Sequence, residues 1–155
     1  EETVEERRIR LAACIMCDLA AMHHPDMRAE HASDIILHSP LTGVDHHGRI
    51  TVAAALFFRH RSKGGAWPEH IPHSLITPEL ENLAIALGMA LRFLADFSAG
   101  SVPALEHCAF ILEGDRLIFR APESCADLDG DTPQKRLAAL ASQLGCAGEQ
   151  LQFKD

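Results

Sequence analysis

The stretch from Leu11 to Asp26 reads LAACIMCDLAAMHHPD, an apolar segment that contains one carboxylate and ends on two histidines. Apolar or small residues recur in it at helical spacing, at Leu11, Cys14, Ile15, Leu19 and Met22. Asp18 shares this helical face, so we expect its side chain to face the core. Because a carboxylate removed from water is costly unless it is paired, Asp18 should have a partner from another helix.

The nature of that partner decides between two interpretations. An arginine, a histidine or a backbone N–H would make Asp18 a structural residue, whereas a bound metal ion would make it part of a catalytic site. His23 and His24 leave the same choice open. At the end of a helix stopped by Pro25 they serve equally well as caps that complement the helix dipole or as metal ligands.

Composition limits the classes of protein to which the chain can belong. Its 155 residues, 47% of them hydrophobic, fit one domain with a small appendage. The net charge of −8 argues against nucleic-acid and anionic-membrane partners, and no apolar run is long enough for a membrane span or a secretory signal. Five cysteines, an odd number set mostly among apolar residues, predict reduced thiols in a cytoplasmic protein. All five are expected to be core residues: Cys14, Cys17, Cys108, Cys125 and Cys146. Because the first residue is Glu1 and not Met, we expect the chain to be part of a longer protein.

Periodicity and end signals predict a mainly α fold, a helical bundle over residues 1–100 with a small α/β appendage over residues 101–155. The expected helices of the bundle cover residues 3–24, 26–38, 45–61 and 78–97. The last of these has two apolar faces and is expected to be the central helix, and Gly88 in its middle predicts close approach by another backbone. The appendage is expected to contain a β-hairpin, a helix and a short strand, at residues 109–119, 132–144 and 151–153.

A basic cluster follows the third expected helix. It comprises Arg59, His60, Arg61 and Lys63, ahead of Gly64 and Gly65. Complementarity to the helix dipole would explain these charges. The functional interpretation is an anion site, because fixed positive charges on a short segment can hold phosphate groups.

Four segments together resemble a known family. They are RIRLAACIMCDLAAMHHPDMRAEH (8–31), LTGVDHHGRITVAAALFFRHR (41–61), ALGMALRFLADFSAG (86–100) and the hairpin LEGDRLIF (112–119). In this order they resemble the C-terminal domain of exopolyphosphatase/guanosine pentaphosphatase (Ppx/GppA) proteins. The resemblance implies an HD-like helical domain and a parent enzyme whose catalysis resides in an N-terminal actin-like portion that uses magnesium. In HD phosphohydrolases a His–Asp pair binds metal, and this sequence has Cys17 and Asp18 at that place.

The resemblance therefore favours a non-catalytic domain that binds inorganic polyphosphate or guanosine pentaphosphate and assists homodimerisation, without a cofactor of its own. The expected anion contacts are Arg59, His60, Arg61 and Lys63. An alternative is an autonomous HD-type metal-dependent phosphohydrolase, for which the candidate ligands are Asp18, His23, His24, His46 and His47. A second alternative is a purely structural dimerisation module.

Overall fold

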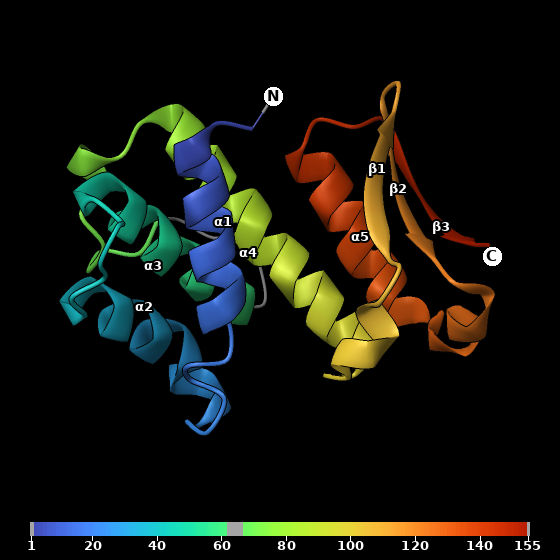
Figure 1. The fold of residues 1–155 in the computed structure, drawn as a ribbon, viewed down its shortest axis with the longest axis horizontal. Helices are drawn as coiled ribbons and strands as arrows, with labels where there is room; N and C mark the ends of the chain where they lie inside the picture. The colour runs from blue at the N-terminus through green and yellow to red at the C-terminus, as the bar shows by residue number, and fades with distance from the viewer. Residues whose placement is uncertain (1, 62–66, 155) are drawn as a thin grey trace. The chain divides into compact units, whose positions relative to one another are not determined.

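The computed structural model describes residues 2–61 and 67–154, and it confirms a mainly helical chain with a small three-stranded sheet near its C-terminus (Figure 1). The chain divides into two compact units, unit 1 at Glu1–Leu91 and unit 2 at Arg92–Asp155. The division lies within the helix α4 (Pro78–Ser98). The domains expected at 1–100 and 101–155 stay a prediction, because compactness alone does not establish a domain that folds independently.

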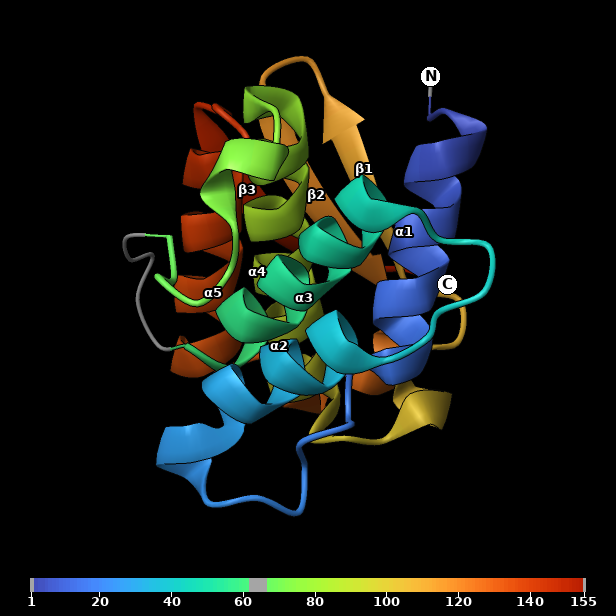
Figure 2. The ribbon, with the colours of Figure 1, turned by 90° about the vertical axis from the view of Figure 1, so that its left-hand side faces the viewer.

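Unit 1 consists of helices (Figure 2). Its elements before α4 are α1 (Val4–Met16), η1 (Pro25–Met27), α2 (Arg28–His38), α3 (His46–His60) and η2 (His73–Leu75). Both α1 and α2 pack against α3. Among the described residues, no helix is long and apolar enough to cross a membrane.

The first helix is shorter than its sequence predicts. Thr3 caps α1 through a capping box, in which its hydroxyl accepts from the Glu6 N–H at 3.1 Å and its own N–H donates to the Glu6 carboxylate at 2.6 Å. The helix ends at Met16, and residues 17–22 form successive turns instead of continuing to His24. The prediction of a single helix to residue 24 is therefore wrong.

The buried face of α1 also differs from the expected one. The residues in the core are Ile9 and Ala13, joined by Ala20 from the following turns. Large apolar residues of the expected face are exposed instead: Leu11 (43%), Ile15 (82%), Leu19 (44%) and Met22 (96%). Small side chains permit close packing of α1 on α3, and this requirement outweighs the greater hydrophobicity of the alternative face.

The helix of unit 1 with the longest buried run is α3. Its N-terminus is capped by Asp45, whose carboxylate accepts from the Gly48 N–H at 2.7 Å. Every residue from Ile50 to Phe58 is buried, which confirms the prediction that this apolar run is enclosed. The close approach expected at Gly88 is confirmed as well, because a Cβ on Gly88 would lie 2.5 Å from the Ala55 carbonyl oxygen of α3.

Unit 2 contains the sheet, whose strand order is β1-β2-β3. The strands are β1 (Ala109–Glu113), β2 (Arg116–Ala121) and β3 (Gly148–Phe153), and α5 (Asp131–Gln143) connects the last two. Strands β1 and β2 form an antiparallel hairpin, while β2 and β3 are parallel, as a helical crossover allows. The hairpin, helix and final strand predicted from the sequence are confirmed.

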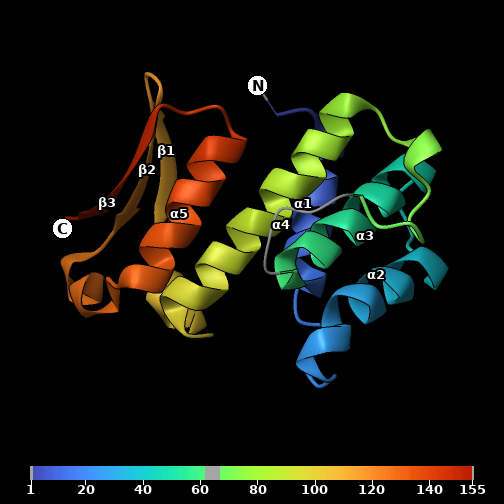
Figure 3. The same ribbon diagram turned by 180° about the vertical axis from the view of Figure 1, so that it is seen from behind.

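The core of unit 2 lies between the sheet and the helical segments around it. Figure 3 shows α5 beside the sheet, where it contributes the buried Leu137, Leu140 and Ala141. Phe119 of β2 contacts three other phenylalanines, with ring centroids 4.7 Å from Phe93, 5.0 Å from Phe97 and 4.9 Å from Phe110. This aromatic cluster fixes β2 as the central strand.

Candidate functional site

Asp18 and Arg59 form an ion pair at the end of the core helix α3. The Arg59 Nη2 donates to Asp18 Oδ1 at 2.6 Å. The Arg59 side chain is only 10% exposed, whereas that of Asp18 is 73% exposed. The pair therefore joins a buried guanidinium to a carboxylate at the surface.

This geometry corrects one part of the prediction for Asp18 and confirms another. The carboxylate does not face the core, because α1 ends before Asp18 and the turns that follow carry it outward. It does have a partner from another helix, and that partner is an arginine. The structural interpretation of Asp18 is thus the one that its contacts support.

Arg59 has a second contact, to its neighbour in the basic cluster. Its Nη1 lies 3.1 Å from His60 Nε2. A guanidinium can only donate, so the imidazole Nε2 must accept and His60 must be neutral for this hydrogen bond to form. The Arg59 Nε is buried and has no hydrogen-bond partner among the described residues. The guanidinium thus makes one hydrogen bond from each terminal nitrogen and none from Nε to a described residue.

Arg61 is the more accessible arginine of the cluster. Its side chain is 51% exposed, and its Nη1 lies 3.8 Å from Glu30 Oε1 of α2. The guanidinium also lies over the ring of Phe57, 5.1 Å from the centroid. An ion pair at 3.8 Å between two half-exposed side chains contributes little to stability. Lys63, the fourth predicted contact, lies outside the described residues.

The histidines proposed as alternative metal ligands lie in separate contacts. His23 Nδ1 lies 3.1 Å from His31 Nδ1, where one imidazole must donate and the other accept. His24 caps η1 by accepting from the Asp26 N–H at 3.4 Å, and His47 Nδ1 donates to the Leu75 carbonyl at 2.6 Å.

His46 is exposed at the start of α3, apart from these contacts. Within residues 2–61 and 67–154, no three histidine, cysteine, aspartate or glutamate side chains gather closely enough to hold a metal ion.

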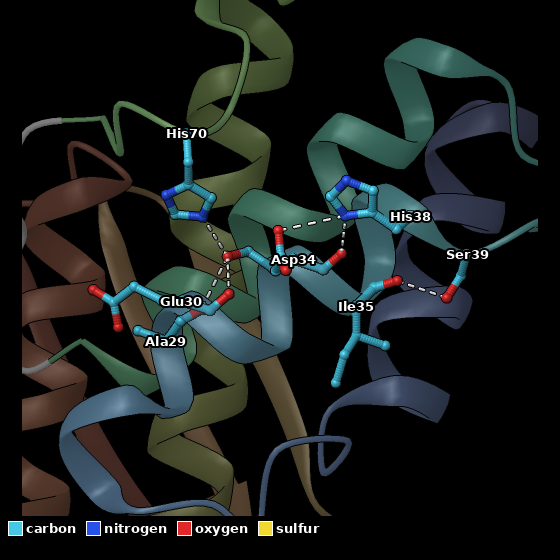
Figure 4. A network of polar contacts seen from close by, with 8 residues as sticks. Ala29, Glu30, Asp34, Ile35, His38, Ser39 and His70 are labelled. Atoms are coloured by element: carbon cyan, nitrogen blue, oxygen red, sulfur yellow. Dashed lines mark hydrogen bonds and ion pairs between the residues drawn. The ribbon is translucent and has the colours of Figure 1, made fainter.

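A Ser–His contact inside unit 1 has the residue types of a nucleophile and its base. Ser33 Oγ lies 2.7 Å from His70 Nε2, and it also lies 3.0 Å from the Ala29 carbonyl and 2.9 Å from the Glu30 carbonyl (Figure 4). Ser33 is fully buried, so no substrate can reach its hydroxyl. The hydroxyl proton is directed to carbonyl oxygens of its own helix, which leaves His70 Nε2 as the donor to Ser33. This contact fastens the loop that carries His70 to α2.

Further contacts hold the segment 67–76, which follows the basic cluster in the chain. Trp67 Nε1 donates to the Ile71 carbonyl at 2.8 Å within this segment. His73 Nε2 lies 2.9 Å from the Glu81 carboxylate. This segment is thus tied to α2, α3 and α4 by imidazole contacts.

The cysteines of the CxxC pattern do not form a reactive or metal-binding pair. All five cysteines are free thiols. Their assignment to the core is confirmed for the buried Cys125 and wrong for the exposed Cys14, while Cys17, Cys108 and Cys146 are half-buried. Burial raises the pKa of the Cys17 thiol, and the nearby Arg59 guanidinium offsets this only in part. A thiol with a raised pKa is protonated at neutral pH and is a poor nucleophile.

Unit 2 contains a basic pocket of about 520 Å³ that sequence reasoning missed. The described residues that line it are His107, Arg120, Pro122 and Lys154. Its cationic side chains come from three separate segments, so no spacing in the sequence connects them. The one available signal is that a parallel pairing of the last strand with β2 would bring Arg120 and Lys154 to the same end of the sheet.

Comparison with known proteins assigns the chain to a family. The model of the family described as "Exopolyphosphatase, C-terminal" matches residues 1–153, which is nearly the whole chain. No curated protein matches the chain. The matched range includes all four segments of the resemblance, 8–31, 41–61, 86–100 and 112–119. The chain belongs to the exopolyphosphatase C-terminal domain family.

Proposed function

We propose that this chain is the polyanion-binding and assembly domain of an exopolyphosphatase-like phosphohydrolase, whose catalysis resides in an N-terminal actin-like portion that uses magnesium. The ligand is a chain of phosphates, either inorganic polyphosphate or guanosine pentaphosphate. The observation that carries the proposal is the run of three basic residues, Arg59 to Arg61, at the end of the buried helix α3, in a chain of this family.

The contacts indicate different roles for these residues in binding. The Arg61 side chain is half exposed, so it is the side chain of the cluster that we expect to contact phosphate oxygens. Arg59 is buried and held by Asp18 and His60, so its contribution is to fix the end of α3 and to add positive potential beneath the surface. Glu30 opposes binding, because its carboxylate competes with phosphate for Arg61.

Titration of the 155-residue chain with polyphosphate at several salt concentrations tests this proposal. We expect Arg61→Gln to weaken binding about tenfold at low salt, since it removes one charge-assisted contact. Glu30→Gln should strengthen binding, because it removes the competing carboxylate. Binding of the wild-type chain should weaken as salt rises.

Arg8→Gln is a matched control for Arg61→Gln. Arg8 also has an exposed side chain, 59% accessible, and its Nη1 also lies 3.8 Å from a glutamate oxygen, that of Glu5. Both variants remove one positive charge and one weak ion pair. If the two weaken polyphosphate binding equally, net charge alone explains the effect and the segment at Arg59–Arg61 is not the site.

The assembly role has its own supporting observation. Along α1 and the turns after it, large apolar side chains are exposed: Val4 (73%), Leu11 (43%), Ile15 (82%), Leu19 (44%) and Met22 (96%). Exposed apolar rows of this kind are typical of protein interfaces, and in a homodimer the same row on a second copy would cover them.

Sedimentation at increasing protein concentration tests dimerisation. We expect a dimer whose dissociation constant rises when Ile15 is changed to Asp, because the charge would be buried at the interface. The matched control is Val102→Asp in unit 2, where the side chain is 74% exposed. A wild-type chain that stays monomeric at high concentration would refute the assembly role and leave the polyanion-binding role untouched.

A further inference from the structure

We propose that His23 and His31 together bind one transition-metal ion of the class of Zn²⁺, Cu²⁺ and Ni²⁺. This inference goes beyond polyanion binding and assembly, and it depends on neither proposal. It rests on the contact between the two imidazole rings, whose Nδ1 atoms lie 3.1 Å apart. The site differs from the HD-type alternative, because the Asp18 carboxylate is not among its ligands.

The loop between α1 and α2 brings the two rings together, although eight positions separate them in the chain. His23 follows the turns after α1, the short helix η1 comes next, and His31 is the fourth residue of α2. The Arg28 Nε donates to the His23 carbonyl at 3.0 Å, which ties the backbone of the loop to the first residue of α2. The two imidazoles are therefore held near each other by a contact other than their own.

The distance between the two Nδ1 atoms suits an ion that binds both of them. Zn²⁺ lies about 2.0–2.1 Å from an imidazole nitrogen, so nitrogens 3.1 Å apart would subtend an angle of roughly 95–100° at the ion. An ideal tetrahedral angle needs the nitrogens only about 0.2–0.3 Å further apart. Because the His23 side chain is exposed, a small rotation of this side chain supplies that shift.

Both rings have a tautomer that leaves Nδ1 free to ligate. Without an ion, one Nδ1 carries the proton of the hydrogen bond between the rings and the other accepts it. With an ion bound, both neutral imidazoles carry their proton at Nε2 and direct the Nδ1 lone pair to the metal. The proton leaves Nδ1 of the donor ring and Nε2 of the same ring takes one up from solvent, so neither ring changes its charge.

The donor atoms identify the class of ion. Imidazole nitrogen is a ligand for Zn²⁺, Cu²⁺ and Ni²⁺, whereas Mg²⁺ and Ca²⁺ take oxygen ligands. No third histidine, cysteine, aspartate or glutamate of the described part of the chain joins the pair, so water fills the remaining positions around the ion. An ion held by both rings links the loop after α1 to α2, and its binding free energy therefore stabilises unit 1.

Calorimetric titration of the 155-residue chain with zinc chloride in a chelator-free buffer tests the site. We expect one ion per chain, and we expect His23→Gln and His31→Gln each to weaken binding at least about tenfold, because each leaves a single imidazole. An excess of magnesium chloride should leave the affinity for Zn²⁺ unchanged. Zn²⁺ should also raise the midpoint of thermal unfolding of the wild-type chain more than that of His23→Gln. His23 is exposed, so His23→Gln provides the test even if His31→Gln, at a half-buried position, fails to fold.

A matched control separates this site from binding at any exposed histidine, since the chain has ten. His38→Gln removes an imidazole from the same helix as His31, with a side chain that is 77% exposed and an Nδ1 that lies 2.9 Å from the Asp34 carbonyl oxygen. It should leave the affinity for Zn²⁺ unchanged, and equal losses in His38→Gln and His23→Gln would overturn the proposal.

Two further outcomes would also overturn it. Loss of the ion in Asp18→Asn would assign the metal to the HD-type alternative. Binding of one ion per two chains would show that the ligands come from two copies, and that His23 and His31 of one chain do not form the site.

Discussion

Gly88 of α4 and Ala55 of α3 lie in backbone contact: a Cβ built on Gly88 would be 2.5 Å from the Ala55 carbonyl oxygen. The same Cβ would lie 2.8 Å from Phe58 Cβ and 3.0 Å from the Arg59 backbone N. The contact is therefore with main-chain atoms of α3, which cannot move without displacing that helix. The contact includes the Arg59 backbone N, so this helix crossing also positions the first residue of the basic cluster.

We expect Gly88→Ala to destabilise unit 1 by roughly 1–3 kcal/mol, because overpacking against backbone outweighs the gain in helix propensity of about 1 kcal/mol. Denaturant unfolding monitored by circular dichroism measures the change. Gly48→Ala is the control in α3, where the nearest atom to an added Cβ is a side-chain atom, Val44 Cγ1 at 2.9 Å, and not a backbone atom. An equal or smaller loss of stability in Gly88→Ala than in Gly48→Ala would contradict the close crossing.

The ion pair between Asp18 and Arg59 allows a test that distinguishes a structural role of Asp18 from a role as a metal ligand. Asp18→Asn leaves the buried guanidinium without its carboxylate, and we expect a loss of about 1 kcal/mol, limited because Asp18 itself is exposed. Elemental analysis of both proteins should show the same divalent-metal content. A stoichiometric metal that disappears in Asp18→Asn would restore the metal-dependent enzyme as the better interpretation.

The buried thiol of Cys17 predicts a stability change at alkaline pH. Because burial raises its pKa in the folded state, the folded chain keeps this proton to higher pH than the unfolded chain. Stability from this group is therefore complete below the unfolded cysteine pKa of about 8.5 and is lost as pH rises through the folded value. We expect Cys17→Ser and Cys17→Ala to reduce the fall in stability between pH 8 and 10 by similar amounts, whatever their stability at pH 7. An unchanged alkaline slope in both would show that Cys17 does not titrate as described.

The backbone conformations of two adjacent residues after α4 predict opposite effects on stability for Ala99→Gly and Gly100→Ala. Ala99 has φ 48° and Gly100 has φ 80°, and an added Cβ on Gly100 would meet nothing within 4 Å. The change in stability on each substitution therefore depends on backbone conformation alone. We expect Ala99→Gly to stabilise unit 2 by about 0.5–1 kcal/mol and Gly100→Ala to destabilise it by about 1 kcal/mol. Thermal unfolding measures both, and changes of the same sign would be inconsistent with these dihedral angles.

The helices were predictable from sequence where local signals marked their ends. Asp45 before α3 and Thr77 with Pro78 before α4 are cap signals that the side-chain contacts confirm. The end of α1 carries no such signal, because no glycine or proline stands between Met16 and Met22. The helix stops there for reasons of packing, as Ala20 enters the core and Asp18 reaches Arg59.

The buried face of α1 was mispredicted for a related reason. Hydrophobic patterning ranks Leu11, Ile15 and Met22 above Ala13 and Ala20, but close helix crossings select small side chains. The same preference accounts for the fully buried alanines of α3, at positions 53, 54 and 55. A stripe of alanines was therefore the better sequence signal for the core of unit 1.

The candidate sites show the same limit of prediction from local sequence patterns. The basic cluster at Arg59–Arg61 is visible in sequence because its members are consecutive. The Ser33–His70 contact joins residues 37 positions apart, and the pocket of unit 2 joins a turn with the ends of two strands. Sites of this kind depend on the register of the sheet and on loop placement, neither of which local patterns specify.

The parallel pairing of β2 with β3 has a consequence for how unit 2 assembles. The β1–β2 hairpin is local and can close within microseconds, whereas β3 reaches β2 only after α5 has crossed over. Until then Leu117, Ile118 and Phe119 stand on an open strand edge with unpaired backbone groups. During synthesis and refolding this apolar edge is exposed to neighbouring chains, so docking of the last strand protects the nascent protein from intermolecular β-pairing and aggregation.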